Sequence, residues 1–222
     1  MSRKHAFERP EGHLSRRQGR KKSYDRMLIV CEGEKTEVNY FEAIRIEMRI
    51  SNADIKVVPG DYGTSPLQVV QYAIDKFSET KAFDRVYAVF DRDQHDSYHN
   101  ALTKAAAQNA KLRNDEGRKI PFTAIPSVPN FELWILLHFR DVFAPLTRAE
   151  VYSELKKAMV YPGYAKNSVT VYADTKDLSL NASARAQGMR AQFNAHSGVD
   201  PYTDVDLLFR ELTKVGSRVK ET

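Results

Sequence analysis

The hydrophobic positions of this chain form short apolar runs that alternate with helical patterns. Four runs, at residues 27 to 31, 55 to 58, 86 to 90 and 121 to 125, are rich in Val and Ile and are bounded by turn residues. Such runs are typical of strands that are buried on both faces. Between them, apolar residues recur at helical spacing. The succession predicts an α/β fold with a Rossmann-like core, in which a parallel sheet is flanked by helices through right-handed crossovers.

The chain from residue 130 onward has a mainly helical pattern. Helices are expected at 131 to 139, 148 to 159, 183 to 195 and 203 to 215, and the segment 161 to 179 is expected to be a loop. We therefore divide the chain into a basic tail, an α/β core, a helical extension packed on that core and a short C-terminal tail. These parts are expected at 1–26, 27–126, 127–215 and 216–222, with a hinge-like boundary at 126 to 129.

Two local signals refine this pattern. Thr36 is expected to cap the first helix, and Ser65 is expected to cap the second, with Pro66 in its first turn. An alanine-rich helix is expected to follow the third strand and to end near Arg113.

Composition narrows the class of protein. The chain has 222 residues, a hydrophobic fraction of 42% and a single cysteine, which suits one globular domain without an internal disulfide. No apolar run approaches the length that a bilayer requires, so no membrane association is expected. The cytoplasm is the expected compartment.

Acidic residues follow two of the predicted strands. Glu32 comes directly after the first strand, and Asp91 and Asp93 come after the third. Because the carboxyl ends of parallel strands meet at one edge of a sheet, these three carboxylates are expected to lie together. Residues 91 and 93 would point to the same side of an extended strand. Clustered carboxylates favour Mg²⁺ or Mn²⁺, which prefer hard oxygen ligands.

Other interpretations of these carboxylates stay open. Glu32 would also suit a helix entry, although the block around it favours a functional role, and Asp93 would suit an Asx turn that ends the strand. Glu37 falls in a first helical turn, where a carboxylate interacts favourably with the helix dipole.

Three sequence blocks together carry a family resemblance. They are Ile29-Val30-Cys31-Glu32-Gly33-Glu34-Lys35-Thr36-Glu37-Val38-Asn39-Tyr40-Phe41, then Val89-Phe90-Asp91-Arg92-Asp93, then Asn130-Phe131-Glu132-Leu133-Trp134-Ile135-Leu136-Leu137-His138-Phe139. The Glu-Gly and Asp-x-Asp pairs resemble the metal site of Toprim (topoisomerase/primase) proteins. The three blocks together resemble the RloB family of bacterial Toprim-like proteins, which are often found beside an AAA-type ATPase in phage-defence loci. The resemblance covers roughly residues 24 to 215 and implies a Toprim core.

The resemblance also raises the interest of a fourth carboxylate. Glu132 lies in a strongly apolar helix, where a charge is seldom buried without a partner. It would either project toward the metal or cap its own helix. Lys166, in the irregular segment, could stabilise charge on a reacting phosphate, bind the substrate backbone or simply be solvated.

The first 26 residues are strongly basic and contain few large apolar residues, so this tail is expected to be disordered in isolation. Its clustered cations are expected to bind nucleic-acid phosphates, although a tail that only aids solubility has the same composition. The central cluster consists of Arg16, Arg17, Arg20, Lys21 and Lys22. Lys35 and Arg92, beside the acidic residues, are further candidates for phosphate contacts.

Our leading hypothesis is a Mg²⁺- or Mn²⁺-dependent nuclease of a bacterial anti-phage system, with DNA, RNA or tRNA as substrate. Glu32, Asp91, Asp93 and Glu132 would hold the cation, and Lys166 would assist catalysis. The alternative is a non-catalytic or conditionally active partner of a defence ATPase. The chain has no G-x-x-x-x-G-K-[ST] loop, so ATP hydrolysis would require another chain. A primase-like nucleotidyl transferase is a third possibility.

Overall fold

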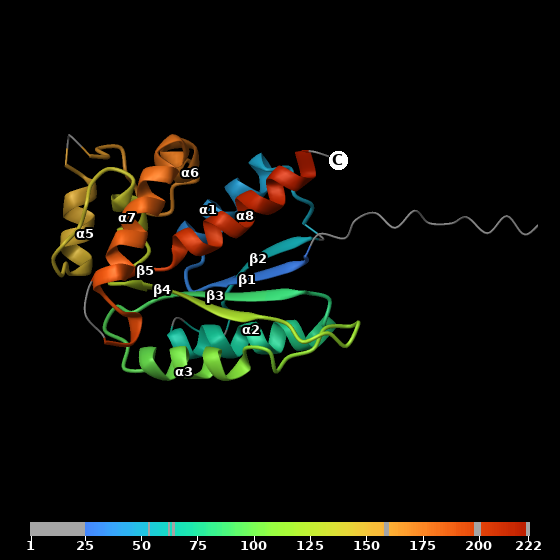
Figure 1. Ribbon diagram of the computed structural model, residues 1–222. Coiled ribbons are helices and arrows are strands. Elements are labelled where there is room, and N and C mark those ends of the chain that lie inside the picture. The colour runs from blue at the N-terminus through green and yellow to red at the C-terminus, as the bar shows by residue number, and fades with distance from the viewer. Residues whose placement is uncertain are drawn as a thin grey trace, which may run out of the picture.

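The structure is a computed structural model of the chain. It describes residues 25–52, 54–61, 63, 65–157, 160–197 and 201–220. Figure 1 shows a central sheet with helices on both faces and further helices at one end.

The sheet has five strands among the described residues, in the order β2-β1-β3-β4-β5. Strands β1 to β4 run parallel to one another, and β5 is antiparallel to β4. Their bounds are Met27–Cys31 for β1, Ile55–Pro59 for β2, Arg85–Asp91 for β3, Phe122–Val128 for β4 and Tyr202–Thr203 for β5. The predicted α/β fold with a mostly parallel sheet and C-terminal helices is therefore confirmed.

Each face of the sheet is covered by a pair of helices (Figure 1). Helices α1 (Thr36–Glu47) and α8 (Val205–Lys220) lie on one face, and α2 (Pro66–Thr80) and α3 (Tyr98–Gln108) lie on the other. Alternate residues of β1 point into two separate cores, with Ile29 in the α1 and α8 core and Val30 in the α2 and α3 core. All five residues of β1 are buried, which explains its continuous apolar run.

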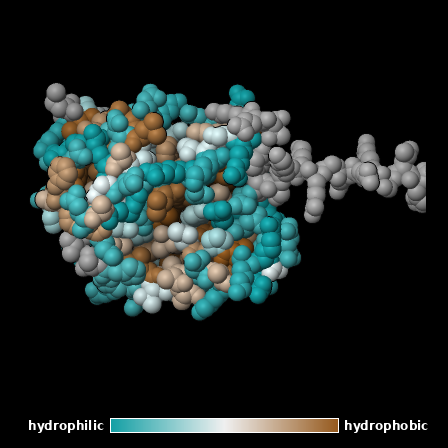
Figure 2. Space-filling model, in the orientation of Figure 1, coloured by the Kyte–Doolittle hydropathy of each residue, from teal (hydrophilic) through white to brown (hydrophobic). Residues whose placement is uncertain are grey.

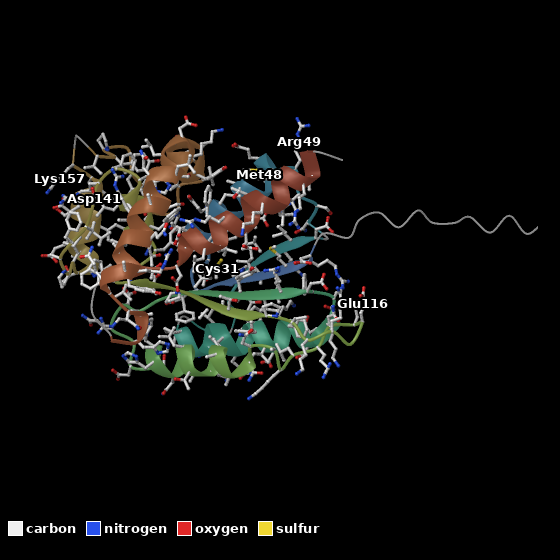
Figure 3. The ribbon with its side chains drawn as sticks, viewed as in Figure 1. Cys31, Met48, Arg49, Glu116, Asp141 and Lys157 are labelled. Carbon is white, nitrogen blue, oxygen red and sulfur yellow. The ribbon has the colours of Figure 1, made fainter. Side chains whose placement is uncertain are left out.

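The C-terminal helices share the core on the α1 face. Trp134, Val151 and Ala186 belong to the same buried cluster as Ile29 and Phe41. These helices are α4 (Glu132–Leu137), α5 (Arg148–Leu155), α6 (Val171–Thr175) and α7 (Ser179–Gln192). In Figure 1, α5, α6 and α7 lie toward the end of the sheet at which the parallel strands finish. Figure 3 places Cys31 at that end of β1 and Glu116 at the opposite end of the molecule.

Strand β4 is longer than predicted. It continues from Phe122 to Val128, through the segment that we expected to be a hinge-like boundary. Pro126 and Ser127 pair with the end of β3, and Ser127 and Val128 also pair with β5, whose residues lie about 75 positions later in the chain. A local pattern cannot show such a partner.

Several helix predictions also need correction, and α8 runs to Lys220, into the part that we expected to be a C-terminal tail. The segment 161 to 179 contains α6, because Tyr172 is buried edge-to-face against Tyr40 at 5.5 Å between ring centroids. Helix α3 ends at Gln108, well before Arg113, and Ala110 has a φ of 58°. Thr36 is the first residue of α1 and Lys35 is its N-cap. The Thr36 hydroxyl instead accepts a hydrogen bond from the Asn167 backbone at 3.3 Å.

The start of α2 agrees with the prediction. Ser65 is its N-cap and is followed by Pro66 in the first turn. The Gln68 side-chain oxygen accepts hydrogen bonds from the backbone and the hydroxyl of Ser65, which satisfies groups that a helix start leaves unpaired.

Two residues that we assigned to the basic tail lie within the described part of the chain. Residues 1 to 24, which include the whole basic cluster, lie outside the described residues. Asp25 and Arg26 are part of the fold, because Asp25 pairs with Arg85 and Arg26 pairs with Asp84 and Asp115.

The outer surface fits this arrangement of layers. Figure 2 shows mostly hydrophilic residues over α8, whose apolar residues Leu208 and Leu212 point into the core. Among the helices in the described ranges, none combines the length and the apolar character that a membrane span needs.

Candidate active site

A pocket of about 500 Å³ lies where β1 and β3 end. Strands, the turn after β1 and the C-terminal extension all contribute to its wall. The lining residues are Glu32, Gly33, Glu34, Lys35, Thr36, Glu37, Asp91, Asp93, His95, Glu132, Arg148, Lys166 and Asn167. The five residues that the sequence suggested for catalysis are thus brought into one pocket.

Glu32 and Asp91 are joined by the sheet itself. The Glu32 backbone N–H donates to Val89 O at 2.9 Å, which extends the β1–β3 pairing by one residue. The Asp91 backbone N–H in turn donates to Glu32 Oε2 at 2.8 Å. Both residues are nearly buried, with exposed fractions of 9% and 8%. The two residues are 59 positions apart in the chain but adjacent in space, because parallel neighbouring strands end at the same edge of the sheet.

Asp93 reaches the pocket by a different route from the one predicted. Strand β3 ends at Asp91, and Asp93 has a left-handed φ of 39°. The turn is held by a hydrogen bond from Asp93 N to Pro129 O at 3.0 Å. The side chain of Asp93 forms an ion pair with Arg148 through Oδ2, whereas Oδ1 is buried without a hydrogen-bond partner among the described residues.

Glu132 is fixed by two tyrosines. It is the first residue of α4 and is only 3% exposed. Its Oε1 accepts hydrogen bonds from Tyr152 at 2.7 Å and from Tyr164 at 3.0 Å. This carboxylate lies in the pocket wall, which agrees with the interpretation that it projects toward the other acidic residues.

Sequence reasoning missed several pocket residues. We explained Glu37 by a favourable interaction with the dipole of its helix, yet its side chain is buried in the pocket. Arg148 and the tyrosines that bind Glu132 lie far along the chain, and no local motif marks them. The sequence feature nearest to a sign of Glu37 in the pocket was the glycine at residue 33, because only a residue without a side chain leaves room there for the Glu37 carboxylate. An added Cβ there would lie 2.1 Å from Glu37 Oε2.

A comparison with family models identifies the group. A model described as RloB-like protein matches residues 27–212. The chain belongs to the RloB-like protein family. The match contains every residue that lines the pocket. Searches of curated proteins and of solved structures gave no significant match.

The electrostatics of this RloB-like pocket are dominated by crowded carboxylates. Its lining includes six acidic residues against Lys35, Arg148 and Lys166. Burial, together with the charges of Glu37 and Asp93, raises the pKa of Glu32 to about 8. Burial and the charge of Glu132 raise the pKa of Glu37 to about 7.

The aspartates respond in the same direction. Burial raises the pKa of Asp91 well above its ordinary value, and the charges of Glu37, Glu32 and Glu132 add to this effect. Burial also raises the pKa of Asp93, although Arg148 opposes the change. For Glu32 and Asp91, neighbouring like charges thus add to the effect of burial.

The donor set suits a hard divalent cation in its chemistry. Carboxylate oxygens are the ligands that Mg²⁺ and Mn²⁺ prefer, and a cation would favour the charged carboxylates that burial and neighbouring like charges disfavour. Within the described ranges, however, no three Asp, Glu, His or Cys side chains are grouped closely enough to form a ready ligand set. Asp93 is paired with Arg148 instead.

The candidate phosphate-binding residues separate into three places. Lys35 and Lys166 line the acidic pocket. Arg92 lines a second pocket of about 480 Å³, which shares Asp93, His95 and Arg148 with the first. Arg16, Arg17, Arg20, Lys21 and Lys22 lie outside the described residues.

We expect Gly33→Ala to disturb the RloB-like pocket by displacing Glu37. The new methyl group would overlap a buried carboxylate, and overpacking of this kind costs about 1 to 3 kcal/mol. Thermal unfolding should show the loss. Gly163→Ala is the matched control, because nothing lies within 4 Å of an added Cβ there. Equal stability of the two variants would show that the Glu37 side chain moves away freely.

Proposed function

We propose that this RloB-like protein is a Toprim-type, Mg²⁺- or Mn²⁺-dependent phosphodiesterase that hydrolyses nucleic acid in bacterial anti-phage defence. The observation that carries the proposal is the pocket at the carboxyl ends of β1 and β3, where buried carboxylates with raised pKa values lie beside lysine and arginine. Groups with strongly perturbed pKa values in a pocket are typical of functional sites. The defence role rests on the resemblance to the RloB family.

The acidic residues would hold the cation. Glu32 and Asp91 are the best placed, since the sheet fixes both backbones and Glu32 Oε2 is oriented by Asp91 N. Asp93 and Glu132 would complete the ligand set. When bound, the cation would polarise a phosphodiester and lower the pKa of a water molecule.

The other residues of the pocket would handle protons and phosphate. At neutral pH, Glu32 and Glu37 hold part of their protons because their pKa values are about 8 and about 7, so cation binding would release protons to solvent. Lys35 and Lys166 lie in the same wall and would contact the phosphate oxygens.

The direct test is a cleavage assay on the purified full chain. Labelled single-stranded DNA, duplex DNA, total RNA and tRNA would be incubated separately with Mg²⁺, Mn²⁺ or EDTA, and the fragment ends would be sequenced. Cleavage that requires a divalent cation and is lost in Glu32→Gln supports the proposal. An exposed acidic residue outside the pocket provides the matched control, Asp177→Asn. Cleavage that persists in EDTA would contradict the proposal.

A defence ATPase is the proposed partner. If the chain alone is inactive on all four substrates, the same assay is repeated with the proposed ATPase partner and ATP. Activity that appears only with the ATPase and ATP would indicate a conditionally active subunit. No activity in either arm, together with no cation binding, would favour a non-catalytic partner.

We expect removal of the basic tail to weaken nucleic-acid binding without affecting the cation site. Deletion of residues 1 to 24 leaves the ion pairs of Asp25 and Arg26 intact, so the fold should persist. Phosphate contacts by clustered cations weaken as salt increases. Fluorescence anisotropy at increasing salt should therefore show a lower affinity and a shallower salt dependence, with unchanged Mn²⁺ binding. Unchanged nucleic-acid affinity would assign the tail to solubility or partner docking.

A further inference from the structure

Arg148 stands in the wall between two neighbouring pockets. It is the first residue of α5 in the C-terminal extension. Both the acidic pocket and the second pocket, which Pro129 and Leu146 also line, include Arg148, Asp93 and His95. A ligand that extends from one pocket into the other would therefore pass this guanidinium.

The backbone of Arg148 is fixed, while its guanidinium group remains accessible. Thr147 and Glu150 form a capping box at the start of α5, with Thr147 N donating to Glu150 Oε2 at 2.7 Å. The Arg148 side chain is 43% exposed and Asp93 is 16% exposed. The Arg148 Cζ atom lies 6.0 Å from the centre of the Tyr152 ring, and Tyr152 donates to Glu132. The arginine thus pairs with one carboxylate that we assign to the cation, Asp93, and lies beside the tyrosine that binds another, Glu132.

The ion pair with Arg148 occupies the carboxylate that the cation site needs. Asp93 Oδ2 is the partner of Arg148, and Oδ1 is buried without a hydrogen-bond partner among the described residues. A guanidinium group matches the geometry of phosphate as well as that of carboxylate and can bind it with two parallel hydrogen bonds. A substrate phosphate would therefore compete with Asp93 for Arg148.

We propose that Arg148 exchanges partners, binding Asp93 in the free protein and a backbone phosphate of the nucleic acid in the complex, so that substrate binding releases Asp93 to the cation. This inference rests on the proposed function. Arg148 is the substrate-binding residue in this exchange, and it acts on the cation site through Asp93. Substrate and cation would then bind cooperatively, because each favours the same rearrangement.

The proposal predicts opposite effects of one substitution on two ligands. In Arg148→Gln, Asp93 is released without substrate, so Mn²⁺ alone should bind roughly two- to fivefold more tightly in isothermal titration, as expected for a half-exposed ion pair. The same variant should bind short single-stranded DNA and RNA more weakly in EDTA, measured by fluorescence anisotropy. Arg148→Lys should lie between the wild type and Arg148→Gln in nucleic-acid affinity, because lysine keeps the charge but lacks the planar fork.

Two comparison variants separate ion-pair exchange from general effects. Arg140 pairs with Glu154 of α5, the helix that carries Arg148, and lies outside both pockets. Arg140→Gln should therefore change neither affinity. Lys166 lines the acidic pocket and carries the same charge as Arg148. Lys166→Gln removes the same charge but does not release Asp93, so it should tighten Mn²⁺ binding less than Arg148→Gln does. Equal tightening would mean that net charge alone is responsible, and the exchange would be wrong.

The remaining outcomes distinguish the inference from the proposed function. If Asp91→Asn loses Mn²⁺ binding but Arg148→Gln does not tighten it, the exchange is wrong and the metal site stands. If Arg148→Gln tightens Mn²⁺ binding but binds nucleic acid like the wild type, Arg148 does not contact phosphate and the exchange is again wrong. If Mn²⁺ binds to neither the wild type nor Arg148→Gln, both the proposed function and the exchange are overturned.

Discussion

Replacing Asp91 by asparagine is expected to abolish the binding of Mg²⁺ and Mn²⁺ and, at the same time, to make the protein more stable. Asp91 is nearly buried and faces the charges of Glu37, Glu32 and Glu132. An amide of almost the same shape removes one of these like charges, which should raise the free energy of unfolding by about 1 kcal/mol or more near pH 8. The loss of a cation ligand should reduce cleavage by about 10³-fold or more.

A loss of cation binding together with a gain in stability is specific to a functional residue. A residue needed only for folding would lose stability when replaced, whereas a residue placed for function at the expense of stability should gain it. Isothermal titration with Mn²⁺ and denaturant unfolding measure the two quantities on one sample. Asp177→Asn, which makes the same chemical change at an exposed site, should leave both unchanged. Unaltered Mn²⁺ affinity in Asp91→Asn would remove Asp91 from the proposed site.

The second large effect is a fall in stability as pH rises from about 6.5 to about 8.5 without divalent cations. The folded chain keeps the protons of Glu32 and Glu37 up to pKa values of about 8 and about 7, whereas the unfolded chain loses them near 4.5. The folded state therefore binds more protons in this window, and its stability must decrease with pH. At about 1.4 kcal/mol for each pKa unit, Glu32 alone accounts for about 2 kcal/mol.

The window avoids two other titrating groups. Burial lowers the pKa of His138 to about 4 from an ordinary value of 6.5, so His138 is neutral in the folded state throughout the window. In the unfolded state it loses its remaining protons just above pH 6.5, so most of its effect on stability falls below the window. Burial raises the pKa of Asp204 to about 6, and this group has lost most of its proton at the start of the window.

Denaturant unfolding at several pH values tests this linkage. Glu32→Gln and Glu37→Gln should each flatten the decline, and Asp177→Asn should not. Saturating Mg²⁺ should stabilise the wild type more at the high end of the window, because a cation no longer competes with protons for the carboxylates there. A flat profile for the wild type would mean that these carboxylates are ionised in the folded state.

Much of the fold follows from short stretches of sequence. The runs at Met27–Cys31 and Arg85–Asp91 are buried on both faces, and such strands need continuous apolar residues that local inspection recognises. The position of Glu32 beside Asp91 followed from the same reasoning, since parallel strands bring their carboxyl ends to one edge.

The parts that were missed depend on contacts between distant residues. Strand β5 forms because Tyr202 and Thr203 pair with the edge of β4. A strand of two residues is too short for its sequence pattern to predict it. Glu37 was assigned to a helix start, which is correct for its backbone but does not show where the side chain points. Asp93 reaches the pocket through a left-handed turn, which strand alternation could not predict.

The sequence by itself determined the α/β succession of elements and a set of carboxylates at the ends of two parallel strands. Only the tertiary structure decided that Glu37 joins this set, that Tyr152 and Tyr164 orient Glu132, and that Arg148 pairs with Asp93. The physical reason is the distance along the chain over which each kind of interaction acts. Strand and helix patterns reflect burial within a few residues, whereas the charge and hydrogen-bond partners of a pocket come from segments that meet only when the helical extension packs against the sheet.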